Sequence, residues 1–166
     1  MPDKEFSKKF CGILVDVCLI IVVASFLSWS FLTRVVMQGF SMNPTIKDRE
    51  VVFINRLYKN MLKLDRYDII AFHMEDQENI KRIIGLPGDH IKISSGNIYV
   101  NGSKIEEDFM QVFLSSNFEQ DLYVENDEYY VLGDNLDSSK DSRYKDFGNV
   151  QKNRVIGKVW HKFGVK

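Results

Sequence analysis

The feature that most constrains this chain is a nearly continuous apolar segment close to its N-terminus, from Phe10 to Leu32. About 20 apolar residues in a helix are enough to cross the hydrocarbon core of a bilayer. The one formal charge, Asp16, lies in the first third of the segment, where its side chain can reach toward the membrane interface. A buried helix of a soluble domain is disfavoured because the segment has no polar face. We therefore predict a transmembrane anchor over residues 10–32.

The charges that precede this segment predict its orientation. Residues 1–9 contain Lys4, Lys8 and Lys9, and basic residues favour the cytoplasmic side of a membrane. We expect a cytoplasmic N-terminus at residues 1–9 and an extracytoplasmic catalytic domain at residues 33–166. A cleaved signal peptide is the alternative, since Ser28-Trp29-Ser30 resembles a small-x-small cleavage site. Signal peptides, however, usually have a shorter apolar region of about 7 to 15 residues.

The composition of the 166-residue chain narrows the remaining possibilities. With 22 basic and 23 acidic side chains, it offers no electrostatic case for binding nucleic acid. Both cysteines, Cys11 and Cys18, lie in the apolar segment, where lipid-facing or packing roles are expected rather than a disulfide or a metal site. The sequence therefore predicts one extracytoplasmic domain and calls for no cofactor or metal.

Beyond the anchor, short β-rich runs alternate with turn signals, and Ser95-Gly96-Asn97 and Asn101-Gly102 fall between such runs. We predict a mainly β, antiparallel, partly closed barrel domain, in which the polar stretch from Ser115 to Glu128 forms a surface loop or a short excursion. The predicted strands are 51–54, 68–72, 80–84, 90–93, 98–100, 129–132 and 155–160.

The first patch with chemical potential is Gly39-Phe40-Ser41-Met42-Asn43-Pro44. Pro44 fixes its own φ and disfavours helix at Asn43, while Gly39 lets the backbone approach closely. Such a loop can hold a serine hydroxyl in the open with a backbone N–H beside it. By itself the pattern is not specific, because a serine near a proline usually belongs to an ordinary turn.

The second patch, residues 80–89, is a strand that ends in a Gly-Leu-Pro-Gly turn. Strand alternation places Lys81 on the same face as Ile83. If that face is buried, desolvation lowers the pKa of Lys81. A lysine that acts as a base near neutral pH needs its pKa lowered from about 10.4 by about 3, which corresponds to about 4 kcal/mol. A solvated lysine on an edge strand is the alternative.

The third patch, residues 133–143, gathers hydroxyls, carboxylates and one guanidinium after an apolar strand. Asp141 and Arg143 can form a charge-assisted pair, and Ser139 can accept and donate hydrogen bonds at once. The patch can therefore orient a neighbouring amine, although a solvated polar turn has the same composition.

In order and spacing, the three patches resemble the type I signal peptidases of bacteria, in their compact Gram-positive-like form. The family motif Ser-Met-x-Pro corresponds to residues 41–44, and Lys-Arg followed by Gly-x-Pro-Gly-Asp corresponds to residues 81–89. The third motif, Gly-Asp-Asn-Arg-x-x-Ser-x-Asp-Ser-Arg, corresponds to residues 133–143 except at Leu136, where the family has arginine. The resemblance implies a serine endopeptidase that removes signal peptides from exported preproteins at the outer membrane surface.

Residue by residue, the resemblance implies that Ser41 is the nucleophile and neutral Lys81 the general base. Ser139 then hydrogen-bonds the lysine amine. Asp141, Arg143 and Asp134 brace the third patch, residues 133–143, which is called the third loop below. The family cleaves after small residues, and shallow apolar pockets are expected at Val35, Met37, Met42, Ile46 and Ile80. Gly39 stands where some relatives have a hydroxyl, so the second oxyanion donor is not identified. Membrane lipid and the secretion translocon are further expected partners.

Other classes remain as alternatives. Residues 39–43 nearly match the Gly-x-Ser-x-Gly elbow of α/β-hydrolases, with His73, His90 and His161 as possible bases, but the second glycine is absent. Leu136 supports a signal-peptidase-like binding module with weak or no catalysis that serves surface-protein assembly, such as that of a pilus. Self-cleaving repressors share the serine-lysine pair, but the membrane segment argues against them. Organelle inner-membrane peptidases remain close relatives by chemistry.

Overall fold

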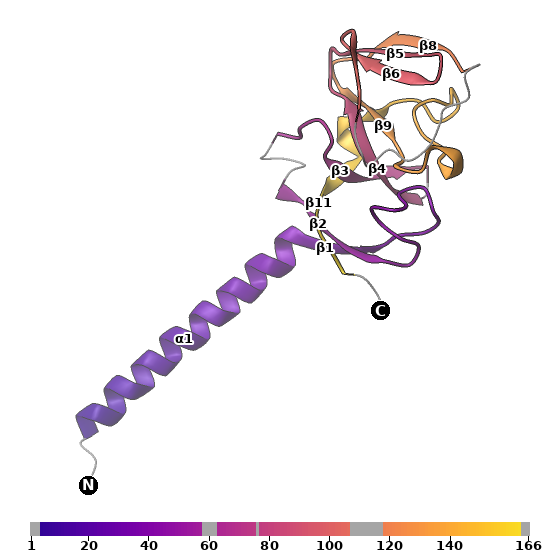
Figure 1. Cartoon of the computed structure of the whole chain (residues 1–166). Helices are drawn as coiled ribbons and strands as arrows, with labels where there is room; N and C mark the ends of the chain where they lie inside the picture. Colours follow the sequence, from indigo (N-terminus) through magenta and orange to yellow (C-terminus); the bar gives the residue numbers. More distant parts are fainter. Residues whose placement is uncertain (1–3, 58–62, 76, 107–117, 164–166) are drawn as a thin grey trace. The chain divides into compact units, whose positions relative to one another are not determined.

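The computed structural model describes residues 4–57, 63–75, 77–106 and 118–163. The chain divides into two compact units, Met1–Leu32 and Thr33–Lys166. The first contains a single helix and the second contains the sheets (Figure 1).

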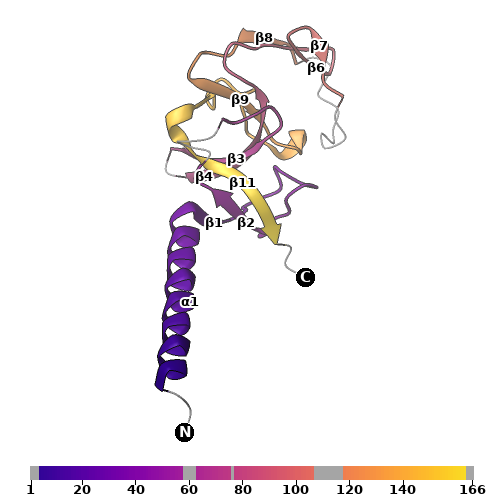
Figure 2. The same cartoon turned by 90° about the vertical axis from the view of Figure 1, so that its left-hand side faces the viewer.

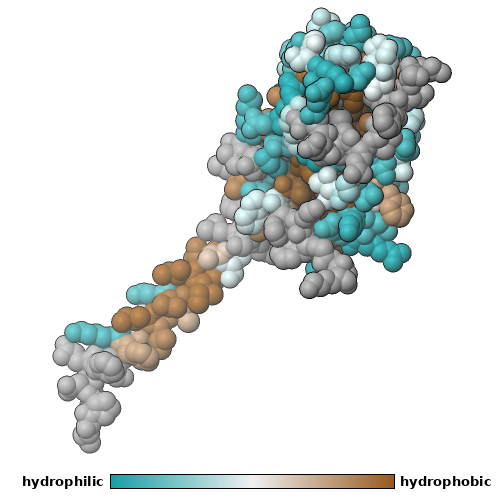
Figure 3. All heavy atoms as spheres, in the orientation of Figure 1, coloured by the Kyte–Doolittle hydropathy of each residue, from teal (hydrophilic) through white to brown (hydrophobic). Residues whose placement is uncertain are grey.

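Helix α1 (Lys4–Phe31) has 28 residues and would extend for about 42 Å at about 1.5 Å per residue. Its stretch from Lys8 to Phe26 is long and apolar enough to cross a membrane, and none of it is buried. Figure 3 shows apolar atoms covering most of this stretch. Cys11 and Cys18 are free and exposed. The helix begins before the predicted anchor and ends before Leu32, which belongs to the first strand.

The larger sheet of the second unit has seven strands in the order β1-β2-β11-β3-β4-β9-β10. The long strand β11 pairs antiparallel with both β2 and β3, and β4 pairs antiparallel with β3 and β9 (Figure 2). The strands are β1 (Leu32–Val36), β2 (Val51–Asn55), β3 (Ile69–Met74), β4 (Gln77–Gly85), β9 (Glu128–Leu132), β10 (Val150–Gln151) and β11 (Val155–Phe163).

The smaller sheet has the order β7-β6-β5-β8, and its neighbouring strands pair antiparallel. Its strands are β5 (His90–Ser94), β6 (Asn97–Val100), β7 (Ser103–Lys104) and β8 (Gln120–Tyr123). Ser95-Gly96 and Asn101-Gly102 form the two tight turns, each with positive φ at both residues. Such paired positive angles match the twist of a hairpin. The predicted turns are therefore confirmed.

The predicted mainly β, antiparallel fold is confirmed, although the sheets do not close into a barrel. Each predicted strand is present, with ends that differ by at most a few residues. The surface-loop interpretation of the polar stretch 115–128 is wrong at β8, which pairs with β5. Residues 115–117 of that stretch lie outside the described residues.

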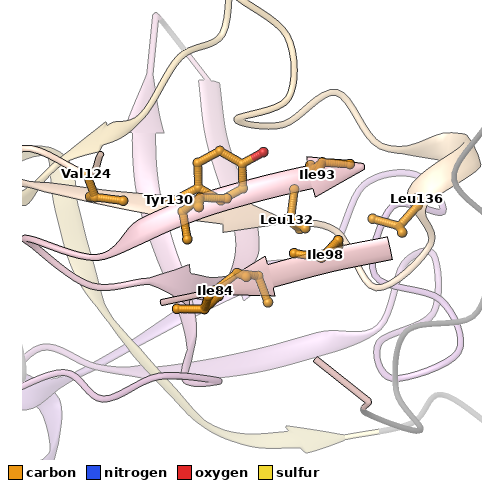
Figure 4. Packing of buried hydrophobic residues seen from close by; sticks show 9 residues of the cluster. Ile84, Ile93, Ile98, Val124, Tyr130, Leu132 and Leu136 are labelled. Carbon is orange, nitrogen blue, oxygen red and sulfur yellow. The ribbon is translucent and has the colours of Figure 1, made fainter. Parts of the chain in front are cut away.

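Three apolar clusters form the core of the second unit. One cluster joins the smaller sheet to the ends of β4 and β9 and contains Ile84, Ile93, Ile98 and Leu132 (Figure 4). A second cluster contains all five predicted pocket residues, together with parts of β2, β3 and β11. The third cluster contains Phe72 and Ile83. Strand β4 contributes to all three clusters, through Ile84, Ile80 and Ile83, and these contacts hold the strand that carries Lys81.

Candidate active site

Ser41 lies in the loop between β1 and β2, and the backbone on both sides of it is tied down. Met37 pairs with the far end of the loop, since its N–H donates to Glu50 O and its carbonyl accepts from Arg49 N, both at 2.9 Å. Gly39 adopts a φ of +84°, a left-handed conformation that favours glycine. Its N–H donates to Asp48 Oδ1 at 2.8 Å. The loop is therefore closed by three hydrogen bonds before the chain reaches Ser41.

Lys81 and Ser41 are brought together although they are 40 residues apart in sequence. The Nζ of Lys81 lies 2.7 Å from the Oγ of Ser41. Both side chains are buried, Lys81 at 4% and Ser41 at 8% exposure. A hydroxyl and an amine at this distance can exchange a proton directly.

Burial lowers the pKa of the Lys81 amine from its ordinary 10.5 to about 8. The largest cause is desolvation, which penalises the charged form. The carboxylate of Asp141 raises this pKa, the guanidinium of Arg143 lowers it, and Asp134 raises it again. The two nearby charges of opposite sign on the third loop therefore partly offset each other, and burial decides the direction.

The third loop is held by a fully buried ion pair. The carboxylate of Asp141 accepts from Arg143 Nε at 2.7 Å and from the Gly133 N–H at 3.1 Å. Arg143 Nη2 also donates to the carbonyl of Leu136 at 2.6 Å. A second pair joins Arg82 Nε to Asp134 at 2.8 Å. These charge-assisted bonds fix the loop in one conformation beside β4.

Direct contacts join the third loop to the Ser41 loop. The N–H of Asn135 donates to the carbonyl of Ser41 at 3.0 Å. A Cβ added to Gly133 would overlap that same carbonyl oxygen and the Ser139 side chain, so only glycine fits there. The implied hydrogen bond from Ser139 to the Lys81 amine is not formed, since Ser139 Oγ is buried without a partner among the described residues.

Leu136 replaces the family's arginine by packing into the core. It is 4% exposed and belongs to the cluster of the smaller sheet. Figure 4 shows its side chain at one end of this cluster, near Ile98 and Leu132. The loop is therefore braced here by apolar contact, and the Asp141–Arg143 pair remains intact.

A small cleft of about 70 Å³ opens on Ser41 and Lys81. Three of the predicted pocket residues line it, namely Val35, Met37 and Ile80, together with Val36, Gln38, Glu78 and Asn79. Met42 and Ile46 are fully buried behind it in the same apolar cluster. A larger hollow of about 500 Å³ near Glu125 and Lys152 contains neither Ser41 nor Lys81.

The strand that carries Lys81 has a free edge beside this cleft. Strand β3 pairs with β4 from Gln77 to Arg82, whereas the pairing of β9 with β4 begins only at Arg82. Among the described residues, the backbone of β4 before Arg82 therefore has no strand partner on the β9 side. An extended peptide can add to such an edge through main-chain hydrogen bonds.

No role was predicted for Asp48, Asn135 or Glu78, although Asn135 belongs to the third patch. Acids and amides in loops and at strand ends are common, so no pattern distinguishes the contacts of these three. Of the three histidines, His73 and His90 do not line the cleft, and the side chain of His161 lies outside the description. No group of three His, Cys, Asp or Glu side chains in the described ranges is placed to hold a metal ion.

Comparison with known proteins identifies the family. A family model for signal peptidase, peptidase S26, matches residues 11–163. Signal peptidase I of Bacillus amyloliquefaciens is 33% identical, covering 93% of this chain and 90% of the relative. Signal peptidase IB of Staphylococcus aureus is 30% identical, covering 96% and 90%.

A solved structure agrees with these matches. The crystal structure of a signal peptidase I from Enterococcus faecalis V583 is 35% identical and has a TM-score of 0.50. The match covers 59% of this chain and 97% of that chain. The resemblance found in the three motifs is thus confirmed, and the chain belongs to the signal peptidase family, peptidase S26.

Proposed function

We propose that this protein is a membrane-anchored serine endopeptidase that removes signal peptides from exported preproteins. Ser41 is its nucleophile and Lys81 its general base. The observation that carries the proposal is the 2.7 Å approach of Lys81 Nζ to Ser41 Oγ in a buried site, where the pKa of the amine is about 8. At pH 7 about one tenth of this lysine is neutral, and that fraction rises as the pH rises.

The reaction follows from this geometry. Neutral Lys81 takes the hydroxyl proton while Ser41 Oγ attacks the scissile carbonyl carbon. We propose the N–H of Ser41 as a donor to the oxyanion, and the loss of one such donor typically lowers kcat about 10² to 10³-fold. The lysine then returns the proton to the leaving amine, which gives an ester between the signal peptide and Ser41. Water activated by the same lysine hydrolyses this ester.

The cleft supports a preference for small side chains. Its volume is only about 70 Å³, and its walls at Val35, Met37 and Ile80 are bulky and apolar. An extended peptide that adds to the free edge of β4 would bring alternate side chains to these walls. We propose that residues one and three positions before the scissile bond occupy this space.

The apolar helix supports attachment to the cell membrane. We propose that α1 spans the bilayer, with residues 1–9 in the cytoplasm and the catalytic domain, residues 33–166, on the outer face. Membrane lipid and the secretion translocon are then its neighbours, and the active site meets preproteins as they emerge. The binding-module alternative rested on Leu136 alone, and no contact of Leu136 favours it.

The test is cleavage of a synthetic signal-peptide substrate by the full chain in detergent micelles. We expect cleavage by the wild type, none by Ser41→Ala, and none by Lys81→Ala. A variant that lacks His73, His90 and His161 serves as the control for a histidine base and should remain active. Full activity of Ser41→Ala would refute the proposal.

A further inference from the structure

The rim of the catalytic cleft carries one acidic side chain, that of Glu78. This residue lies on β4 and lines the cleft that contains Ser41 and Lys81. The other residues that line the cleft are apolar, amide-bearing or catalytic. The Glu78 side chain is exposed, and within the described ranges it has no ion-pair or hydrogen-bond partner. Its charge is therefore available to a bound peptide.

The position of Glu78 on the strand indicates which part of a peptide it would meet. Glu78 precedes Lys81 by three residues, a separation of about 10 Å at about 3.3 Å per residue. Ile80, a wall of the space assigned to the small residue before the scissile bond, lies between them. Moving along β4 from Lys81 to Glu78 therefore follows the peptide away from the scissile bond, toward its N-terminal side.

We propose that Glu78 selects substrates by charge, favouring lysine or arginine over aspartate or glutamate two or four residues before the scissile bond. This inference rests on the proposed function. The third position before the scissile bond is excluded, because its side chain must be small to fit the cleft. An exposed ion pair typically changes affinity by about two- to three-fold, and a like-charge pair opposes binding to a similar extent. The two effects together give a difference of about three- to ten-fold between the cationic and the acidic peptide.

The charge of Glu78 is separable from catalysis. The charged groups that act on the Lys81 amine are Asp141, Arg143 and Asp134, and Glu78 is not among them. Removing the charge at position 78 is therefore expected to change substrate preference without moving the pH dependence of kcat/KM. A role in tuning the base would move that dependence instead.

The experiment compares peptides that are identical except for Lys, Gln or Glu at the second or fourth position before the scissile bond. The full chain in nonionic detergent is assayed at low salt and again at high salt. For the wild type we expect kcat/KM for Lys to exceed that for Glu by about three- to ten-fold at one of the two positions, and less at high salt because exposed charges are screened. Glu78→Gln should bring this ratio close to one, and Glu78→Lys should invert it.

Glu125→Gln is the matched control, because it removes the same charge from the hollow that contains neither catalytic residue. It should keep the ratio of the wild type. Equal rates for Lys and Glu peptides in the wild type, or the same ratio in Glu78→Gln as in the wild type, would overturn the charge selection. Failure of the proposed function itself looks different: no peptide would be cleaved, or Ser41→Ala would cleave them all.

Discussion

Replacing Lys81 with methionine should abolish activity and yet stabilise the fold at neutral pH. Methionine has a similar length and no charge, so it suits a position that is only 4% exposed. The wild-type protein instead buries an amine that is mostly protonated at pH 7, since its pKa is about 8. The substitution therefore removes both the base and the penalty for burying its charge.

The size of the effect follows from the lowered pKa. A tenfold change in a protonation equilibrium corresponds to about 1.4 kcal/mol, so lowering the pKa from 10.5 to about 8 corresponds to about 3 kcal/mol. The unfolded chain holds this proton more tightly than the folded chain does. The penalty is therefore fully present below about pH 8, and it disappears as the pH rises toward 10.5. Loss of the hydrogen bond to Ser41 offsets about 1 kcal/mol of the gain.

The assay is urea unfolding of the full chain in nonionic micelles at several pH values between 7 and 10. We expect Lys81→Met to exceed the wild type by about 2 kcal/mol at pH 7, with a difference that shrinks and then reverses as the pH approaches 10. Lys92→Met, at an exposed lysine on β5, is the control and should show a difference that is independent of pH. A pH-independent loss of stability in Lys81→Met would refute the reasoning that burial tunes this amine.

Three further predictions test other parts of the site. The kcat/KM of the wild type should rise about tenfold per pH unit below pH 8 and level off above it, because the neutral amine is the active form; a flat profile would contradict this assignment. Gly133→Ala should lower kcat by about 10²-fold or more, since its Cβ displaces Ser41 and Ser139. The control Gly157→Ala, whose Cβ meets the Asn55 backbone instead, should lower stability but keep the kcat of the folded fraction. Leu136→Ala should destabilise the fold by about 2 to 5 kcal/mol in urea unfolding, and Leu136→Met by less than about 1.5 kcal/mol. Equally small effects of the two substitutions would show that the third loop is braced elsewhere.

Strands could be predicted where β-branched runs end at turn residues, and they were missed where that contrast is weak. Leu32, the first residue of β1, continues the apolar composition of α1, so no signal separates helix from strand at this residue. Strand β8 has the sequence Gln-Asp-Leu-Tyr, and its backbone pairing with β5 holds it at the edge of the smaller sheet. Edge pairing depends on the partner strand, and local composition does not encode it.

The candidate site could be predicted in its residue types but not in its contacts. Alternation predicts that Lys81 shares a buried face with Ile83, but Ile80 and Ile84 on the other face are equally buried. Lys81 is desolvated because residues far away in the sequence lie against it, Ser41 among them, and the local pattern does not encode these contacts. The same holds for the contact of Asn135 with the Ser41 carbonyl, which exists only once the third loop has folded back onto the loop that carries Ser41.

The buried ion pairs explain how an amine can remain a base in the presence of two carboxylates. Asp141 and Asp134 each raise the pKa of Lys81, which favours the inactive ammonium form. Each is paired, Asp141 with Arg143 and Asp134 with Arg82, and Arg143 itself lowers the pKa of the lysine. The carboxylate of Asp141 is needed to hold the loop through bonds such as that to the Gly133 N–H, and Arg143 offsets part of its stabilisation of the ammonium form. Loop rigidity and the neutral fraction of Lys81 at a given pH thus both depend on the Asp141–Arg143 pair, so a substitution that leaves Asp141 unpaired should lower both.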